Sequence, residues 1–396
     1  MQNSQLSNNE DLKKSARIAT PAYVVYESRL RRNLSLLKRV EAEAGIKIIM
    51  AFKANALWKT FPVIAEYFTS STASSVNEMT LSLRHLGNDV HAYCPVYTPS
   101  VFPEFMAGCS HITFNSIAQF ERFKNDIVKW NSTARRRVSA GLRVNPKCSV
   151  VDTDIYNPAV PGSRFGVDVA SLGDELPEGI EGLHFHALCE SDSYDLEKVL
   201  VDFEKKFSRF LPSLKWLNMG GGHLITRKGY DTDHFIKMMR ALRQRYPNLE
   251  IIIEPGSAFT WQTGDLLTTV LDVVEDSGIK TGIIDASFAC HMPDCLEMPY
   301  KPAIAEALPE GNEKNGQAYR LGGNSCLSGD FVGNWYFKSP LEVGQRLTLL
   351  DMNHYTTVKT NMFNGIQHPS IWFVPQQGEP RLLRSFTYED YEGRMD

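Results

Sequence analysis

Residues 46–53, IKIIMAFK, are the stretch of sequence that decides the fold. Apolar side chains follow one another here almost without a break, which is typical of a strand buried on both faces, as in a parallel sheet. Apolar residues at helical spacing precede the stretch over residues 27–44, and a second helix is expected near residues 61–68. The order helix, buried strand, helix is typical of α/β proteins.

The same alternation continues along the chain. Further strands are expected at residues 72–76, 90–95, 111–114, 138–144, 182–186, 215–219 and 250–253, and further helices at residues 77–86 and 116–129. About eight such units fit a closed (β/α)8 barrel, with an open doubly wound sheet as the alternative. Past Gly256 short β-rich segments separated by turns replace the alternation, which predicts a second, mainly β domain.

These patterns predict an α/β chain with three segments. Residues 1–27 form an N-terminal segment whose strand, at residues 22–26, is expected to join the β domain. Residues 28–258 form the barrel, and residues 259–396 form the C-terminal β domain.

Composition argues against several classes of function. Of the 396 residues, 43% are hydrophobic and 22% charged, as in an ordinary globular protein. No apolar run approaches the roughly 20 residues of a membrane span. A net charge of −4, with no basic block longer than residues 135–137, gives no electrostatic argument for nucleic acid. The N-terminus lacks the features of a signal peptide, and the seven cysteines form no C-x-x-C pair, so we expect a cytoplasmic location.

Lys53 ends the central strand and is followed at once by Ala54 and Asn55. An amine held against apolar walls loses hydration, so its charged form is disfavoured and its pKa falls. A neutral lysine amine is what Schiff-base chemistry requires. The alternative is an ordinary lysine whose charged end reaches solvent from a strand end.

A glycine run follows the predicted strand at residues 215–219, at the end where such barrels build their active sites. Gly220, Gly221 and Gly222 permit a tight turn and let backbone N–H groups approach an anion such as phosphate. A plain turn is the alternative.

Glu254 ends the predicted strand at residues 250–253, and Ser257 follows it. A carboxylate at the end of a buried strand needs a partner. A protonated ring nitrogen is one candidate and a structural Arg or Lys is the other, while Ser257 could add a phosphate contact.

His184 and His186 lie two residues apart on a predicted strand, so both side chains should face the same side. A zinc site would need further ligands in matching places and would leave the glycine run and Lys53 unexplained. Stacking of a neutral His186 ring on a flat cofactor is therefore favoured, with a buried structural histidine as the alternative.

Cys326 lies in a glycine-rich, polar loop, LGGNSCLSGD, at residues 321–330. Its thiol is expected to be more exposed than a cysteine in the core, which suits an acid at a reaction site. Tyr355, further along the chain, offers a phenol.

Five motifs, in this order, make the chain recognisable: AFKAN around Lys53, the HFH strand, MGGGH, EPGS and GNSCLSGD. As a set they resemble those of the pyridoxal-phosphate decarboxylases with an alanine-racemase-like barrel, and the resemblance covers residues 20–373. Within that group, FKAN, GNSCL and the stretch DASFACHMPDCLEMPY at residues 285–300 are most similar to the carboxynorspermidine (carboxyspermidine) decarboxylases.

The resemblance implies a role for each barrel motif. Lys53 would hold pyridoxal 5'-phosphate as a Schiff base, His186 would stack on its ring, and Glu254 would face the pyridine nitrogen. The residues implied to hold the phosphate are Gly220, Gly221, Gly222, Ser257 and Tyr355.

The resemblance also implies a head-to-tail homodimer with two shared active sites. Cys326 and Asp330 would come from the partner protomer, and Cys326 would donate a proton to the α-carbon of the substrate. Two departures narrow the substrate. Ornithine and diaminopimelate decarboxylases carry an acidic residue where this chain has Leu327, and an arginine where it has Ser257.

A long cationic substrate needs acidic partners elsewhere, and Asp294 and Glu297 are the candidates. The expected reaction is decarboxylation of carboxynorspermidine or carboxyspermidine to norspermidine or spermidine, in polyamine biosynthesis. The alternatives are decarboxylation of another diamino acid such as diaminopimelate, amino-acid racemisation, or a non-catalytic homologue. Racemisation needs a second base where this chain offers Cys326, and retention of both Lys53 and Cys326 argues against a non-catalytic homologue. Metal, nucleic acid and membrane are not expected as partners.

Overall fold

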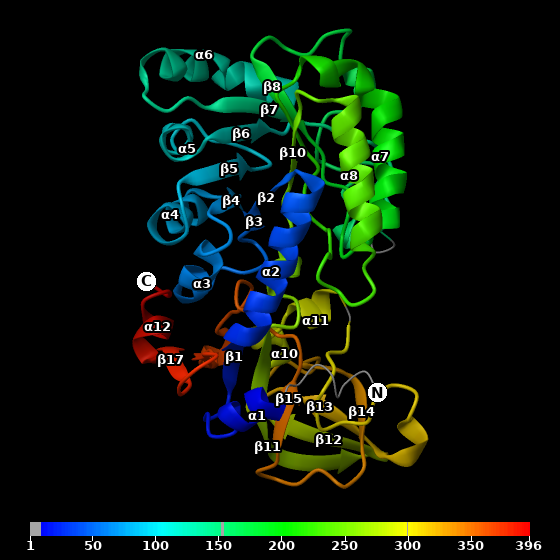
Figure 1. Ribbon diagram of the computed structural model, residues 1–396. Coiled ribbons are helices and arrows are strands. Elements are labelled where there is room, and N and C mark those ends of the chain that lie inside the picture. Colours follow the sequence, from blue (N-terminus) through cyan, green and yellow to red (C-terminus); the bar gives the residue numbers. More distant parts are fainter. Residues whose placement is uncertain (1–8, 152–153, 299) are drawn as a thin grey trace. The chain divides into compact units, whose positions relative to one another are not determined.

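The central stretch is a strand in two halves, β2 (Lys47–Ile48) and β3 (Met50–Ala51), interrupted at Ile49. The computed structural model describes residues 9–151, 154–298 and 300–396. It divides the chain into two units: Asn33–Phe259 form the barrel unit, and the described residues before Asn33 together with Thr260–Asp396 form the β unit (Figure 1).

The barrel unit contains a parallel sheet in the order β2-β10-β9-β8-β7-β6-β5-β4-β3. Its other strands are β4 (Ser70–Ala73), β5 (Asp89–Tyr93), β6 (His111–Phe114), β7 (Ser139–Arg143), β8 (Ile180–His184), β9 (Trp216–Asn218) and β10 (Glu250–Ile253). Because β2 and β3 are consecutive parts of one stretch, the two ends of the sheet meet. The N–H of Ile49 bridges the break by donating to the carbonyl of Ile253 at 3.0 Å. The predicted (β/α)8 barrel is confirmed over the open sheet.

Helices cover the outside of these strands, with α4, α5 and α6 on one side in Figure 1 and α7 and α8 on the other. The helices that accompany the barrel are α2 (Glu27–Ala44), α3 (Phe61–Ala65), α4 (Val76–His85), α5 (Phe102–Gly108), α6 (Ile117–Thr133), α7 (Ser193–Phe207) and α8 (Thr232–Arg245). Several begin at a side-chain cap: Ser75, Ser116, Asp192 and Asp231 each accept a hydrogen bond from a backbone N–H of the first turn. Helix α5 was not expected from the sequence, because seven residues are too few to show a helical period.

Trp216, the first residue of β9, fills part of the barrel interior. It is buried and packs with Ile49 and Ile252. Gly141 on β7 and Gly182 on β8 make room for it, since a Cβ at these positions would lie 2.1 Å and 2.0 Å from the indole ring. Glycine at both positions is therefore a packing requirement.

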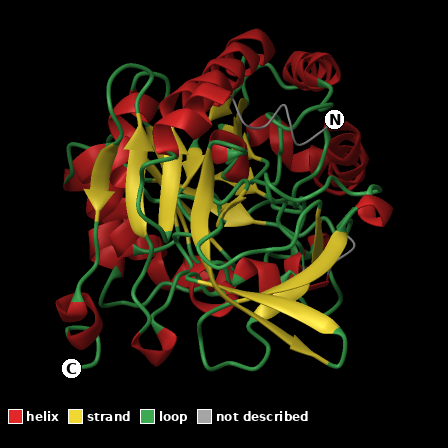
Figure 2. Cartoon of the chain, turned by 90° about the horizontal axis from the view of Figure 1, so that it is seen from below, coloured by secondary structure: helices red, strands yellow, loops and turns green. Residues whose placement is uncertain are grey.

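The β unit is built on a mixed sheet in the order β14-β13-β12-β11-β1-β16-β17, with β15 paired to β11. Its strands are β1 (Ala22–Tyr26), β11 (Gly264–Asp276), β12 (Ile279–Ile284), β13 (Gln317–Gly322), β14 (Phe331–Phe337), β15 (Arg346–Leu349), β16 (Ser370–Val374) and β17 (Arg381–Arg384). Strand β1 pairs antiparallel with β11 and parallel with β16, so the N-terminal strand lies inside this sheet. Figure 2 shows the strands of both units in yellow. The predicted mainly β domain is confirmed.

Short helices complete the described chain: α1 (Asn9–Ser15), α9 (Ser257–Thr260), α10 (Phe288–His291), α11 (Asp294–Glu297) and α12 (Tyr388–Glu392). Among all described helices, none combines the length and the apolar character needed to cross a membrane.

Candidate active site

Lys53 lies just beyond the end of β3. The strand stops at Ala51, and the following turn is closed by a hydrogen bond from the N–H of Ala54 to the carbonyl of Ala51 at 3.3 Å. The Lys53 side chain is partly accessible to solvent, but many protein atoms surround its amine. These atoms displace water from the charged form, and this desolvation lowers the pKa of the amine. The charge of Glu254 opposes the shift and the charge of Arg143 adds to it. The predicted lowering of the lysine pKa is confirmed.

Glu254 follows β10 and is buried, with 7% of its surface exposed. Its Oε1 accepts a hydrogen bond from Nδ2 of Asn218 at 2.6 Å, and its Oε2 lies 3.7 Å from Nε2 of His184. Desolvation holds the pKa of His184 well below its ordinary value, so this ring is neutral. An ionised carboxylate accepts more than one hydrogen bond, so Glu254 retains capacity to accept one from a ligand.

His186 contacts the glycine run directly. Its Nδ1 accepts a hydrogen bond from the N–H of Gly221 at 3.0 Å, so Nδ1 carries no proton. Desolvation, with the charges of Lys53 and Arg143, lowers the pKa of the ring well below its ordinary value and keeps it neutral. A Cβ on Gly221 would lie 2.6 Å from the carbonyl oxygen of Glu254 and 3.2 Å from Cε1 of His186. Only glycine lets the turn approach both residues this closely.

The glycine run has fewer available N–H groups than its sequence suggests. The N–H of Gly220 donates to Oδ1 of Asn218 at 2.9 Å, and that of Gly221 is used by the histidine ring. Within the described part of the chain, the N–H of Gly222 has no protein partner. Ser257, the first residue of α9, is half-buried. The groups suited to an anion here are therefore the Gly222 N–H and the Ser257 hydroxyl.

Arg143, at the end of β7, is a site residue that sequence analysis missed. Its guanidinium carbon lies 4.6 Å from the ring centroids of both Tyr93 and Phe165, and its Nη2 donates to the carbonyl of His186 at 3.4 Å. The guanidinium is buried and stays charged, so it lowers the pKa of the neighbouring amine of Lys53. The available signal was its position at a predicted strand end, the same signal that singled out Lys53.

Cys326 is exposed, as predicted, and lies in the loop between β13 and β14. Its N–H donates to Oδ1 of Asn364 at 2.8 Å. Asp330 is buried, and its carboxylate accepts hydrogen bonds from the N–H and hydroxyl of Ser325 at 3.2 Å and 2.6 Å and from the N–H of Ala289 at 2.9 Å. In the chain as described, Asp330 thus holds the Cys326 loop to the start of α10.

Asp294 and Glu297, the two ends of α11, both bind the side chain of Lys359. Its Nζ lies 2.7 Å from Oδ1 of Asp294 and also bonds Oε2 of Glu297.

Tyr355 lies four residues before Lys359 and has a φ of 52°, in the left-handed region that few residues other than glycine adopt. Glu254 and His186 lie close enough to Lys53 to interact electrostatically with it, whereas the other predicted residues beyond Ser257 belong to the β unit.

The family model described as "Pyridoxal-dependent decarboxylase, C-terminal sheet domain" matches residues 23–353. The chain belongs to the pyridoxal-dependent decarboxylases. It is 46% identical over 379 residues to the carboxyaminopropylagmatine decarboxylase of Synechocystis sp., with 96% of each chain covered. It is 36% identical over 387 residues to the carboxynorspermidine/carboxyspermidine decarboxylase of Campylobacter jejuni, covering 96% of this chain and 99% of the relative.

A solved structure gives the same assignment. The crystal structure of carboxynorspermidine decarboxylase complexed with norspermidine from Campylobacter jejuni matches with a TM-score of 0.85 and 35% identity, covering 95% of this chain and 100% of that one. The predicted family, the decarboxylase activity and the pyridoxal-phosphate cofactor are confirmed.

The barrel residues of this decarboxylase fit pyridoxal phosphate. An amine with a lowered pKa suits the aldehyde, a neutral imidazole suits a flat ring, and a buried carboxylate with spare acceptor capacity suits a protonated ring nitrogen. Zinc fits less well. His184, His186 and Glu254 offer ligand atoms within 4.8 Å of one another. However, Nδ1 of His186 already accepts the Gly221 N–H, so the proton of the neutral ring lies on Nε2 and neither nitrogen is available to a metal.

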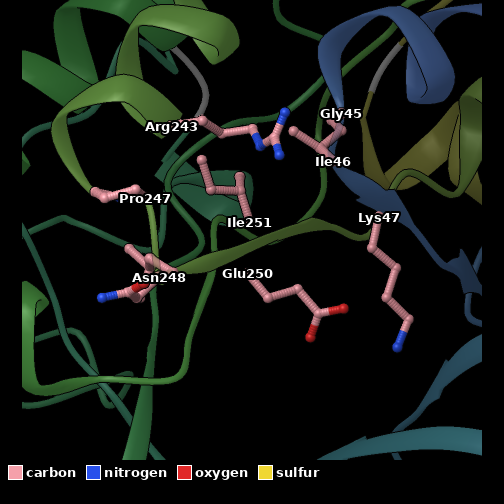
Figure 3. Close-up of a pocket in the computed structure, with 9 residues that line it drawn as sticks. Gly45, Ile46, Lys47, Arg243, Pro247, Asn248, Glu250 and Ile251 are labelled. Atoms are coloured by element: carbon pink, nitrogen blue, oxygen red, sulfur yellow. The ribbon is translucent and has the colours of Figure 1, made fainter.

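A pocket of about 330 Å³ lies at the ends of the barrel strands that are opposite to Lys53 and Glu254 (Figure 3). It is lined by Gly45, Ile46, Lys47, Arg243 and residues 247–251, where β2 and β10 begin. Lys47 binds Asp89 at 2.7 Å, so this mouth of the barrel carries its own ion pair. Lys53 follows the end of β3 and Glu254 follows the end of β10, at the opposite ends of these strands, so the pocket is separate from the active site.

Proposed function

We propose that this decarboxylase acts on carboxynorspermidine or carboxyspermidine and releases CO2 with norspermidine or spermidine, in polyamine biosynthesis. The observation that carries the substrate assignment is the carboxylate pair of Asp294 and Glu297, which holds the alkylammonium of Lys359. A polyamine ends in the same chemical group. The apolar, exposed Leu327 beside Cys326 supports a site without an acidic residue at that position.

In this proposal the barrel, residues 28–258, carries the cofactor. The β domain, which consists of the C-terminal residues 259–396 joined by the N-terminal segment 1–27, supplies Cys326. Pyridoxal phosphate supplies an electron sink for the electron pair that the departing CO2 leaves. Lys53 would hold the cofactor through its amine, and the same amine would help to release the amine product. Glu254 would accept a hydrogen bond from the ring nitrogen and so favour its protonated form.

The remaining barrel residues bind and orient. The neutral ring of His186 would stack on the cofactor, and the Gly221 N–H holds the ring in place. Gly222, Ser257 and Tyr355 would hold the phosphate. Gly220 and Gly221 shape the turn, since their own N–H groups bond within the protein.

Cys326 is proposed to donate a proton to the α-carbon from the partner protomer of a homodimer. A matched pair of inactive variants tests the shared site. In an equal mixture of K53A and C326A chains, half of the dimers are mixed and each has one intact site of two, so about a quarter of wild-type activity should return. No recovery under demonstrated subunit exchange would contradict the shared site. Asp330 is proposed to act there with Cys326, and its bonds to Ser325 and Ala289 support a role in holding the loop.

A second substrate is favoured by a specific observation, the 46% identity to a carboxyaminopropylagmatine decarboxylase. That substrate ends in a guanidinium in place of an ammonium. CO2 release should be measured with carboxynorspermidine, carboxyspermidine, carboxyaminopropylagmatine and diaminopimelate. The proposal expects kcat/KM at least about tenfold higher for one of the first two than for the third. A clear preference for carboxyaminopropylagmatine establishes the second candidate, and a preference for diaminopimelate overturns both.

Lys359 offers a direct test of the acidic pair. If the substrate ammonium replaces the lysine amine between Asp294 and Glu297, K359M removes the competing amine and lowers KM, while D294N raises KM with kcat little changed. If the pair only anchors α11, K359M lowers the thermal midpoint and leaves KM as it is. The second result would remove Asp294 and Glu297 from the substrate site.

A cytoplasmic location also remains a proposal, which cell fractionation with an antibody against the chain would test.

A further inference from the structure

The backbone N–H of Cys326 is held by one side chain from a distant part of the sequence. The Cys326 loop has its own ties, since Asp330 bonds Ser325 and Ala289, but none of these reaches the cysteine's own amide. That N–H donates to Oδ1 of Asn364 at 2.8 Å. The bond is exposed to solvent. Because Asn364 is the acceptor, the position of the cysteine depends on how firmly Asn364 is held.

Asn364 belongs to a tight turn that is anchored on one side to α10. Its φ is 58° and that of Gly365 is 70°, so two successive residues lie in the left-handed region that asparagine and glycine tolerate. Before them, Asn361 donates from its Nδ2 to the carbonyl of Ala289 at 2.8 Å and accepts the N–H of Phe363 at 3.0 Å on its Oδ1. The base of the turn is therefore fixed where α10 begins.

The other side of the turn faces the C-terminal helix α12, which lies next to the C label in Figure 1. The ring of Tyr391 packs against Gly365, where a Cβ would lie 3.5 Å from Cζ. Helix α12 begins at its N-cap Thr387, whose N–H donates to the carboxylate of Asp390 at 2.9 Å in a capping box. The same carboxylate binds Arg384 at the end of β17, so the helix is held at its start. The contacts thus run from β17 through α12 and the turn to Cys326.

We propose that Asn364 and Tyr391 are positioning residues for Cys326, and that the C-terminal segment 386–392 braces the loop that presents its thiol. The inference rests on the proposed role of Cys326 in proton donation. Asn364 holds the cysteine's amide directly, and Tyr391 acts through Gly365 by limiting movement of the turn.

Four variants of the holoenzyme test the brace. N364G removes the acceptor and tolerates the left-handed φ, whereas N364D keeps an acceptor oxygen and is the matched control. Y391A removes the packing ring, whereas Y391F keeps it. Two quantities are measured in each: hydrogen–deuterium exchange at the Cys326 amide, and kcat with KM for CO2 release.

We expect exchange at the Cys326 amide to be about fivefold faster in N364G and in Y391A, the size expected for loss of one exposed hydrogen bond. In both, kcat should fall about fivefold while KM stays within twofold, because a misplaced proton donor affects the reaction more than substrate binding. N364D and Y391F should restore both quantities toward wild type.

Unchanged exchange in N364G overturns the role of Asn364, and faster exchange in N364G with wild-type exchange in Y391A overturns the brace. Exchange is independent of chemistry, so the two proposals can fail separately. If C326A keeps the wild-type kcat, the proton-donor role and the catalytic part of this inference are wrong. The exchange result still decides whether the C-terminal segment holds the loop.

Discussion

Gly221 shapes the cofactor site because it has no side chain. A Cβ there would lie 2.6 Å from the carbonyl of Glu254 and 3.2 Å from the ring of His186, and neither neighbour can move without disturbing the site. We expect G221A to lower kcat/KM by about 100-fold, the usual cost of displacing reacting groups by about 1 Å. Absorbance at about 420 nm, typical of lysine-bound pyridoxal phosphate, should fall with it.

A matched control for this variant is G173A. A Cβ on Gly173 would have its nearest atom at 3.8 Å, and the residue is exposed to solvent. Its kcat/KM should stay within twofold of wild type. A fully active G221A enzyme would contradict the described contact between the turn and His186.

Residue-level prediction from sequence succeeded where the environment is set by the local pattern. The lowered pKa of Lys53 and the exposure of Cys326 both follow from a buried strand end and a polar loop. Hydrogen-bond partners depend on distant segments, so the use of two glycine N–H groups by Asn218 and His186 was not predictable. The same is true of Lys359, which lies 62 and 65 residues beyond the two carboxylates that it binds.

At the scale of elements, the barrel depends on one large ring matched to two glycines. Trp216 on β9 occupies the space above Gly182 on β8, where a Cβ would lie 2.0 Å from the indole. G182A should therefore lower the free energy of unfolding by about 2–3 kcal/mol, as overpacking of a core does. Urea titration followed by fluorescence measures this change.

A second substitution separates packing from backbone effects. W216L in the G182A background provides space for the new methyl group and should recover part of the lost stability. If G182A is as stable as the wild-type chain, the glycine is not required by packing.

Elements with a strong period were predictable, and short or broken ones were not. The alternation of buried strands and amphipathic helices gave the barrel, because parallel strands need helical connections. The break of the central strand at Ile49 and helix α5 were missed, since two-residue strands and a seven-residue helix carry little periodic signal.

At the scale of the whole molecule, buried neutral histidines make stability depend on pH. Desolvation lowers the pKa of His223 and of His291 to about 4. In the unfolded chain both titrate near about 6.5. Below that pH the unfolded chain binds more protons than the folded one, so the free energy of unfolding falls as pH drops from about 6.5 to about 4.

His291 is suited to a test because it is fully buried and its Nδ1 accepts the N–H of Ser287 at 3.1 Å. H291N keeps an acceptor but cannot be protonated. The difference in stability between pH 7 and pH 5 should be smaller in H291N than in wild type, by on the order of 1–2 kcal/mol. Thermal midpoints at both pH values measure it, and an equal or larger difference in H291N would show that this histidine does not carry the effect.

The central claim is that Lys53, at the end of the broken central strand, carries pyridoxal phosphate. Borohydride reduction of the purified holoenzyme fixes the cofactor to its lysine, and peptide mapping by mass spectrometry then locates it. The account predicts the added mass on the peptide that contains Lys53. Cofactor mass on the peptide of another lysine, or a K53A chain that still takes up the label, would contradict it.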